Sequence, residues 1–154
     1  MTISHFHRPL ASLALITGLA VAAPAGAGAA NAAPLRSFCA AVKAVGPVPA
    51  YAAATSSLTR AQAYSRAVGS YDSRVSTARN AAPPGAASAA WAAASTSVLS
   101  LENDTADLTR YLQSLGSSKA TISKTLANLE SQIPRVHRAI GTAQVASRAR
   151  GCAL

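Results

Sequence analysis

The amino-acid sequence predicts an all-α protein, an antiparallel up-down four-helix bundle with a short first helix and with its termini tied by one disulfide. Apolar residues recur at alternating steps of three and four along four segments, which is the spacing of one helix face. Stretches rich in Pro, Gly and Ser separate these segments. The two cysteines, Cys39 and Cys152, bracket them.

The first 32 residues have the pattern of a secretory signal peptide. Arg8 precedes a run of 14 apolar or small residues, 10–23, which suits a signal-peptide core and is too short for a membrane-spanning helix of about 20 residues. Ala30 and Ala32 fit the small-x-small rule for cleavage best, and Ala27 and Ala29 offer a second site. We therefore expect a signal peptide at 1–32 and one domain at 33–154, without a membrane-spanning segment after cleavage.

The first two predicted helices lie on either side of the stretch "GPVPAYAAATSS" at 46–57. A short apolar series precedes it, and a longer series follows it. The short series is Leu35, Phe38, Val42 and Val45, and the longer one is Ala61, Tyr64, Val68, Tyr71, Val75 and Ala78. Thr59 and Gln62 have the spacing of a capping box at the start of the second helix.

The third predicted helix follows the break "NAAPPGA" at 80–86. Its apolar series has a single polar member, Thr105, and begins with a tryptophan that we expect to anchor the core. The series is Trp91, Ala94, Val98, Leu101, Thr105, Leu108, Leu112 and Leu115.

The fourth predicted helix begins after a short turn in which Gly116 suits a C-cap and Ser118 an N-cap. Pro134 lies inside this helix and predicts a kink near 130–134. The apolar series is Ile122, Leu126, Leu129, Ile133, Val136, Ile140 and Ala143.

The cysteines and the number of helices predict the same topology. In an up-down bundle of four helices the first helix starts at the end where the fourth finishes, so Cys39 and Cys152 meet there. Three helices would leave them about 30 Å apart, beyond disulfide reach. Closing a loop of 113 residues stabilises a domain by about 4 to 5 kcal/mol in the chain-entropy model. The short first helix leaves a second arrangement open, in which it caps the other three.

Residues 33–154 contain 13 Lys and Arg against 5 Asp and Glu, a net charge of +8. Helix periodicity places five basic residues on outward positions, where we expect contact with anionic envelope polymers or lipid head groups. These are Arg66, Lys124, Arg135, Arg138 and Arg148. The alternative is that the arginines only keep an alanine-rich bundle soluble and stabilise helix C-termini. Nucleic acid is not expected, because the chain lacks basic motifs interleaved with aromatic residues.

The sequence predicts a protein that is not an enzyme. It has no GxSxG motif and no phosphate-binding loop. His137 is the single histidine of residues 33–154, so no metal site or cofactor is expected. The acidic residues Glu102, Asp104 and Asp107 are expected to be solvated charges, with Asp107 close to Arg110.

Three stretches, "SFCAAV", "AAPPGAASAAW" and "SRARGC", give the chain a resemblance to small exported, alanine-rich, two-cysteine helical proteins of high-GC Gram-positive bacteria. The resemblance implies a secreted or envelope-associated protein and transfers no functional residue. We therefore expect an exported, non-catalytic module that interacts with the envelope through a basic surface. The alternative is a carrier of a hydrophobic ligand, lipid or haem-like, held between the helices.

Overall fold

The computed structural model describes residues 27–51, 57–114 and 116–154. Within them it contains four helices: α1 (Ala27–Val45), α2 (Leu58–Ala81), α3 (Ala86–Gln113) and α4 (Lys119–Arg148). Most of the predicted signal peptide, 1–26, and Leu115, the last residue of the third apolar series, lie outside the described residues. The all-α fold predicted from the sequence is confirmed.

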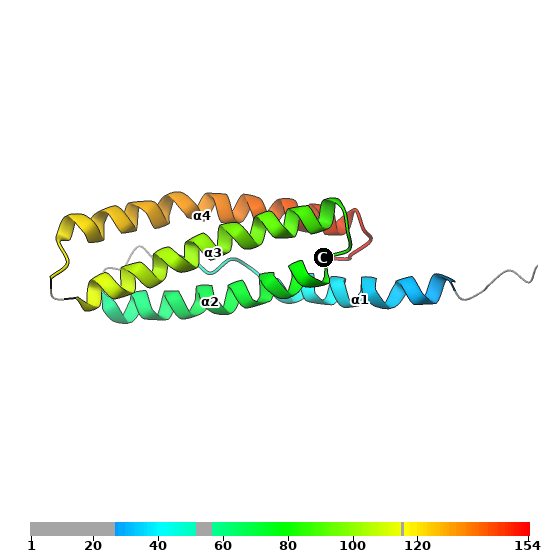
Figure 1. Cartoon of the computed structure of the whole chain (residues 1–154), viewed down its shortest axis with the longest axis horizontal. Helices are drawn as coiled ribbons and strands as arrows, with labels where there is room; N and C mark the ends of the chain where they lie inside the picture. The colour runs from blue at the N-terminus through cyan, green and yellow to red at the C-terminus, as the bar shows by residue number, and fades with distance from the viewer. Residues whose placement is uncertain (1–26, 52–56, 115) are drawn as a thin grey trace, which may run out of the picture.

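The three long helices run antiparallel to one another in sequence order, and α3 packs along both α2 and α4 (Figure 1). The short helix α1 packs mainly against α2 and only marginally against α4. Its C-terminal end lies beside Arg74, whose Nε donates a hydrogen bond to the carbonyl oxygen of Val45 at 3.2 Å. Its N-terminal part extends past the end of α2 (Figure 1). The first helix therefore covers one end of the bundle, which is the second arrangement left open by the sequence.

An extended segment, residues 46–51, continues along α2 where α1 stops. Gly46 begins it with a φ of 67°, a left-handed conformation that glycine adopts without a steric penalty. Val48 and Tyr51 pack against the core, and the Tyr51 ring meets the Tyr64 ring edge-on with 5.5 Å between centroids. This segment covers the stretch of α2 that a longer first helix would have covered.

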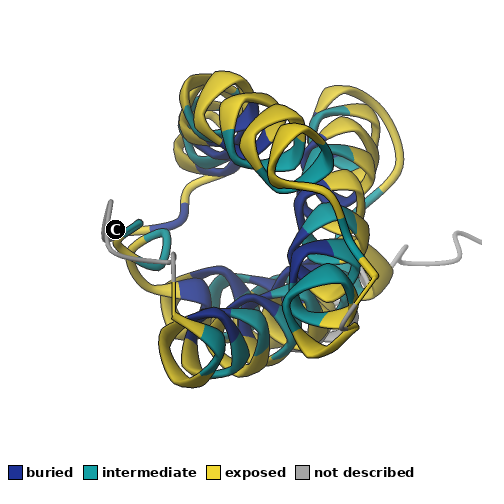
Figure 2. Cartoon of the chain, turned by 90° about the vertical axis from the view of Figure 1, so that its left-hand side faces the viewer, coloured by how far each residue is buried: buried dark blue, intermediate teal, exposed yellow. Residues whose placement is uncertain are grey.

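The predicted apolar series form the core. Figure 2 shows the buried faces of the helices turned toward a common interior. All six residues of the α2 series are buried, as are Phe38, Val42 and Val45 of α1. Trp91 is fully buried, as expected of a core anchor, and Thr105 is buried with its hydroxyl donating to the Glu102 carbonyl oxygen at 2.8 Å. The series of α4 is buried only in part, since Ile122, Leu126 and Ile133 are half-buried.

Helix ends agree with the sequence predictions at one position and differ at two. Ser118 is the N-cap of α4, with its side chain accepting from the Thr121 N–H. The capping box proposed at Thr59 is wrong, because Ser57 caps α2 and accepts from the N–H three residues on. The C-cap predicted at Gly116 is also wrong, because α3 already ends at the C-cap Ser114. The helix α4 continues through Pro134.

Candidate functional site

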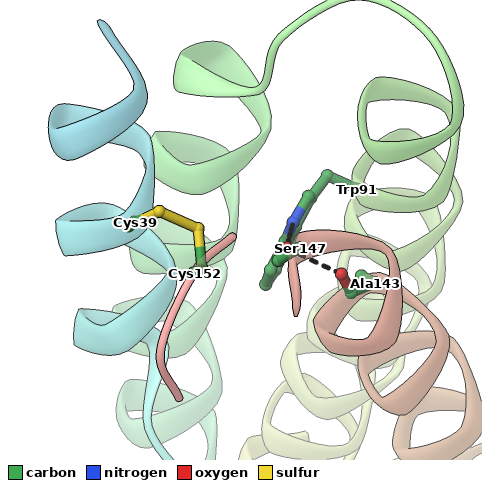
Figure 3. Close-up of a disulfide and its surroundings, with 5 residues drawn as sticks. All are labelled: Cys39, Trp91, Ala143, Ser147 and Cys152. Carbon is green, nitrogen blue, oxygen red and sulfur yellow. Dashed lines mark hydrogen bonds between the residues drawn. A yellow bond between two sulfur atoms is a disulfide. The ribbon is translucent and has the colours of Figure 1, made fainter. Parts of the chain in front are cut away.

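The disulfide between Cys39 and Cys152 closes the end of the bundle where α1 and the C-terminus meet (Figure 3). The two Cα atoms are 5.2 Å apart, and Cys152 is 4% exposed. The turn after α4 makes this possible, because Gly151 has a φ of 92° and reverses the chain. Its N–H donates to the Arg148 carbonyl oxygen at 2.8 Å, and the Cys152 N–H donates to the Ser147 carbonyl oxygen at 3.2 Å. These two bonds form a Schellman motif, which satisfies the last carbonyls of the helix.

A buried serine fastens this turn to the core. The Trp91 indole N–H donates to the Ser147 hydroxyl oxygen at 2.9 Å, and that hydroxyl donates to the Ala143 carbonyl oxygen at 2.8 Å (Figure 3). Both side chains are fully buried. Trp91 of α3 and Ser147 of α4 thereby set the register of the two helices beside the disulfide.

The five predicted contact residues are all exposed, but they do not form one patch. Arg66 lies on α2 and the other four lie on α4, and these two helices do not pack against each other. At 100° per residue, Arg148 points about 80° away from Arg138 around the helix. The structure therefore places Arg66 apart from the α4 group.

Charge is instead divided lengthwise between two halves of the bundle. We call residues 34–45, 70–99 and 135–154 the disulfide half, and the remaining described residues from 46 to 134 the distal half. The disulfide half contains eight basic residues against one acidic residue, Asp72, whereas the distal half contains five basic against four acidic. The eight are Arg36, Lys43, Arg74, Arg79, Arg135, Arg138, Arg148 and Arg150, and all are exposed.

The basic groups of the disulfide half have few internal partners. Arg74 donates to a backbone carbonyl and lies 5.6 Å from the centroid of the Tyr71 ring. Arg150 donates through Nη2 to the Pro84 carbonyl oxygen at 2.8 Å. Across the described residues one ion pair is present, and it joins Arg110 to Asp107 in the distal half, as predicted. The guanidinium groups of the disulfide half are therefore not neutralised by carboxylates of the chain.

A polar groove runs between α3 and α4 on the outer side of the core. It consists of a cavity of about 610 Å³ and a neighbouring cavity of about 230 Å³, and Asn128 lines both. The larger is lined by Asp104, Asp107, Tyr111, Thr121, Lys124, Thr125 and Asn128. The smaller is lined by Thr96, Ser97, Ser100, Asn128, Gln132 and Arg135.

A hydrogen-bonded cluster joins the two walls of the polar groove. Asp104 Oδ2 accepts from Asn128 Nδ2 at 2.6 Å and also from Gln132 Nε2. Asp104 is therefore half-buried and held by two amides, which the sequence analysis did not predict. Sequence reasoning missed this cluster because the contact depends on the register between α3 and α4. The available signal was Asn128 and Gln132, two amides four residues apart beside the apolar series.

A third cavity, of about 410 Å³, lies near the disulfide and has mainly apolar walls. It is lined by Pro34, Leu35, Ala81, Pro83, Pro84 and Arg150. His137 lies on the exposed side of α4. In the part of the chain that the structure describes, no three His, Cys, Asp or Glu side chains come together as a potential metal site.

No protein-family model, curated protein or solved structure matches this chain. Among the described helices, none combines the length and the apolar character needed to cross a membrane.

Proposed function

We propose that the protein is an exported, non-catalytic module that binds anionic envelope polymers or lipid head groups through its disulfide half. The observation that carries this proposal is the lengthwise division of charge, with eight basic residues against one acidic residue at one end of the bundle. Long-range attraction between exposed charges is screened beyond about 8 to 10 Å at physiological salt. Local excess charge, rather than the net charge of the chain, therefore decides which end meets an anionic surface.

The chemistry of the basic residues suits phosphate-bearing partners. Seven of the eight are arginines, whose planar guanidinium offers paired donors to a phosphate and loses less hydration than an ammonium group. The exposed arginines lie on α1, α2, α4 and the C-terminal turn, so they surround the end of the bundle. Such an arrangement favours docking by the end onto an extended anionic polymer or membrane surface.

Two features support export. A disulfide with one buried cysteine fits an oxidising compartment. Pro34 lies inside α1, where proline is costly, but it would be a first-turn residue in a chain cut after Ala32. The predicted cleavage would thus leave a first helix whose proline occupies a tolerated position.

The carrier alternative has one supporting observation, the mainly apolar cavity of about 410 Å³ lined by Pro34 and Leu35. The interior between the helices supports it less, because Trp91, Tyr71 and Phe38 fill that interior and are fully buried. Mass spectrometry of the protein purified from culture supernatant distinguishes the two functions. Lipid retained in equimolar amount would favour the carrier, and its absence together with salt-sensitive binding would favour the envelope module.

The test compares two variants that each lose three positive charges. The first replaces Arg79, Arg138 and Arg148 of the disulfide half with glutamine. The control replaces Arg60, Arg66 and Lys119 of the distal half. The structure gives none of these six side chains a hydrogen bond or ion pair, so both variants should keep the helical content of the parent protein. Lys124 and Arg135 stay unchanged because they line the polar groove.

Binding is measured by sedimentation with phosphatidylglycerol vesicles and with poly(glycerol phosphate), at low and high salt. We expect the disulfide-half variant to lose about tenfold or more in affinity, since each basic residue near an anionic surface contributes about 1 kcal/mol. The control should lose much less. Equal losses would mean that only net charge matters, and binding unaffected by salt and by both variants would leave the arginines as a solubility feature.

A further inference from the structure

The two cavities between α3 and α4 form one polar groove, and the proposed binding of anionic partners gives this groove no role. Asn128 lines both of its cavities, and Asp104 and Gln132, one from each cavity, are hydrogen-bonded to each other. The larger cavity, about 610 Å³, falls within the range of small-ligand sites. The groove lies on rigid helices whose register is set by a cross-helix cluster.

Several groups in the walls of the polar groove offer only hydrogen-bond acceptors, whereas Lys124 and Arg135 offer only donors. The hydroxyls of Thr96, Ser97 and Thr125 each donate to a carbonyl oxygen one turn earlier in their own helix, at 3.1, 3.0 and 3.0 Å. A hydroxyl whose proton is used in this way presents only its lone pairs. The carboxylates of Asp104 and Asp107 add further acceptors. A ligand that fits these walls must therefore supply several donors, together with acceptors for Lys124 and Arg135.

One acceptor of the groove lacks a donor altogether. Gln132 is 9% exposed, its Nε2 donates to Asp104, and its Oε1 is buried without a hydrogen-bond partner. The bond to Asp104 fixes the orientation of the amide, because a carboxylate accepts only from the NH₂ group. A buried acceptor without a donor is costly, so a small movement of the Gln132 side chain that brings Oε1 to a ligand hydroxyl or N–H would be stabilising.

The charges of the groove balance, in contrast to the rest of the chain. Two acidic residues, Asp104 and Asp107, and two basic residues, Lys124 and Arg135, line the groove, and Asp107 is also paired with Arg110, so the net charge of the lining favours neither a phosphate nor an ammonium ligand. Tyr111 adds an aromatic ring to the wall of the larger cavity. A saccharide has these properties together. It carries many hydroxyl groups, it has no net charge, and it offers an apolar face to an aromatic ring.

We propose that the polar groove binds an uncharged, hydroxyl-rich saccharide segment, with Asp104, Asn128 and Gln132 as the central hydrogen-bonding residues. Most of the groove lies in the distal half, although Thr96, Ser97 and Arg135 belong to the disulfide half, and the proposal does not depend on the proposed function.

The test follows the side-chain amide signals of Asn128 and Gln132 by NMR in ¹⁵N-labelled protein. The probes are neutral tetrasaccharides of glucose, mannose, arabinose and N-acetylglucosamine, with spermidine as a cationic probe and glycerol phosphate as an anionic one. We expect at least one tetrasaccharide to shift both amide signals in a saturable way, and neither charged probe to do so. No saturable shift with any tetrasaccharide, or saturable shifts of these signals with a charged probe, would overturn the proposal.

Matched variants then locate the binding. Gln132→Leu should weaken tetrasaccharide binding about tenfold or more, because it removes the unpaired acceptor and one of the amides that hold Asp104. Gln144→Leu makes the same change on α4 outside the groove lining and should leave binding unchanged. If Gln132→Leu does not fold, Thr96→Val takes its place. Thr96 is exposed, valine has nearly the same shape as threonine, and the loss of the hydroxyl should also reduce the affinity. If Gln132→Leu folds and still binds the saccharide with the parent affinity, the assignment is contradicted. If Gln132→Leu does not fold, unchanged affinity of Thr96→Val contradicts it.

The disulfide-half charge variant should leave saccharide binding intact, so a failure of one proposal can be told apart from a failure of the other.

Discussion

The two halves of this bundle differ in what holds them together and in what they present to solvent. The disulfide half has a covalent link, the Trp91–Ser147 hydrogen bond and a helix end closed by Gly151, and its exposed charges are nearly all positive. The distal half has half-buried apolar residues on α4, an ion pair and most of the polar groove, and its acidic and basic residues are nearly equal in number. The contrast teaches that the more firmly fastened end is also the end that concentrates positive charge.

That combination has a physical reason. Like charges repel one another in a folded domain, so a cluster of arginines lowers stability unless other contacts offset it. A disulfide stabilises the fold whatever the charge around it. The distal half, without such a link, keeps its acidic and basic residues nearly equal in number.

Removing the disulfide should produce the largest change. In the double variant Cys39→Ala and Cys152→Ala, the free energy of unfolding should fall by about 4 to 5 kcal/mol, because the unfolded chain is no longer closed over 113 residues. Hydrogen exchange should quicken most in α1, which has few contacts with helices other than α2. Urea denaturation and hydrogen exchange measure both effects. If exchange quickened equally in α1 and in the distal part of α3, the disulfide would not stabilise its own half more than the other.

Charges placed in the distal core should be almost as damaging. Leu108→Asp and Leu129→Asp each bury a carboxylate at a position that is at most 1% exposed, and among the described residues no basic side chain is buried to pair with it. We expect each to cost about 4 kcal/mol or to unfold the domain. Leu99→Asp, at a position 49% exposed on α3, is the control and should melt close to the parent temperature. Unchanged melting of the two core variants would show that the distal core is not packed as described.

A smaller effect is expected at the link between Trp91 and the C-terminal turn. Ser147→Ala leaves the buried indole N–H without an acceptor, which costs about 1 to 3 kcal/mol. Ser95→Ala removes another buried serine hydroxyl, one that carries no hydrogen bond in the structure, and should cost less. Thermal denaturation ranks the two variants, and a larger loss for Ser95→Ala would contradict the role given to Ser147.

The smallest expected effect is a loss of stability at alkaline pH, which involves one buried tyrosine in each half. Burial raises the pKa of Tyr64 to about 12 and that of Tyr71 to about 12. The folded state keeps these protons between pH 10 and 12 while the unfolded state releases them, so stability is full below pH 10 and falls as the pH rises through this window. We expect a loss of about 1 kcal/mol per tyrosine between pH 10 and 11.

The Tyr64→Phe and Tyr71→Phe variants should each flatten this alkaline loss. Neither phenol oxygen has a hydrogen-bond partner among the described residues, so both variants should also be as stable as the parent at neutral pH, or more stable. Urea denaturation between pH 7 and 11 makes the comparison. A parent protein whose stability is constant over that range would contradict the burial of both phenols.

Periodicity and the cysteines predicted most of this fold. The α2 series is buried at all six positions because three-and-four spacing alone places a residue on one side of a helix. The disulfide was predictable because an even number of antiparallel helices brings the start of the first helix and the end of the fourth to the same end of the bundle. The extended segment at 46–51 and the position of α1 were not predictable in the same way, because they depend on how far a short helix extends along its neighbour.

The candidate site was predictable only in its composition. The excess of arginine is visible in the sequence, but its concentration at one end requires the antiparallel path of the chain to bring 34–45, 70–99 and 135–154 together. Arg66 and Arg148 both lie outward, as helix periodicity predicts, yet on helices that do not touch. The Asp104 cluster depended on the register between two helices, which periodicity within one helix does not contain.

The central claim, that the disulfide half is the end that meets anionic partners, is tested most directly by NMR of the ¹⁵N-labelled protein with poly(glycerol phosphate). Signals of amides near the contact broaden or shift, and each can be assigned to one half. The account predicts that perturbations concentrate at residues 34–45, 74–85 and 138–152 and disappear at high salt. Perturbations that concentrate instead around the distal turn between α3 and α4, or that spread evenly over the molecule, would contradict it.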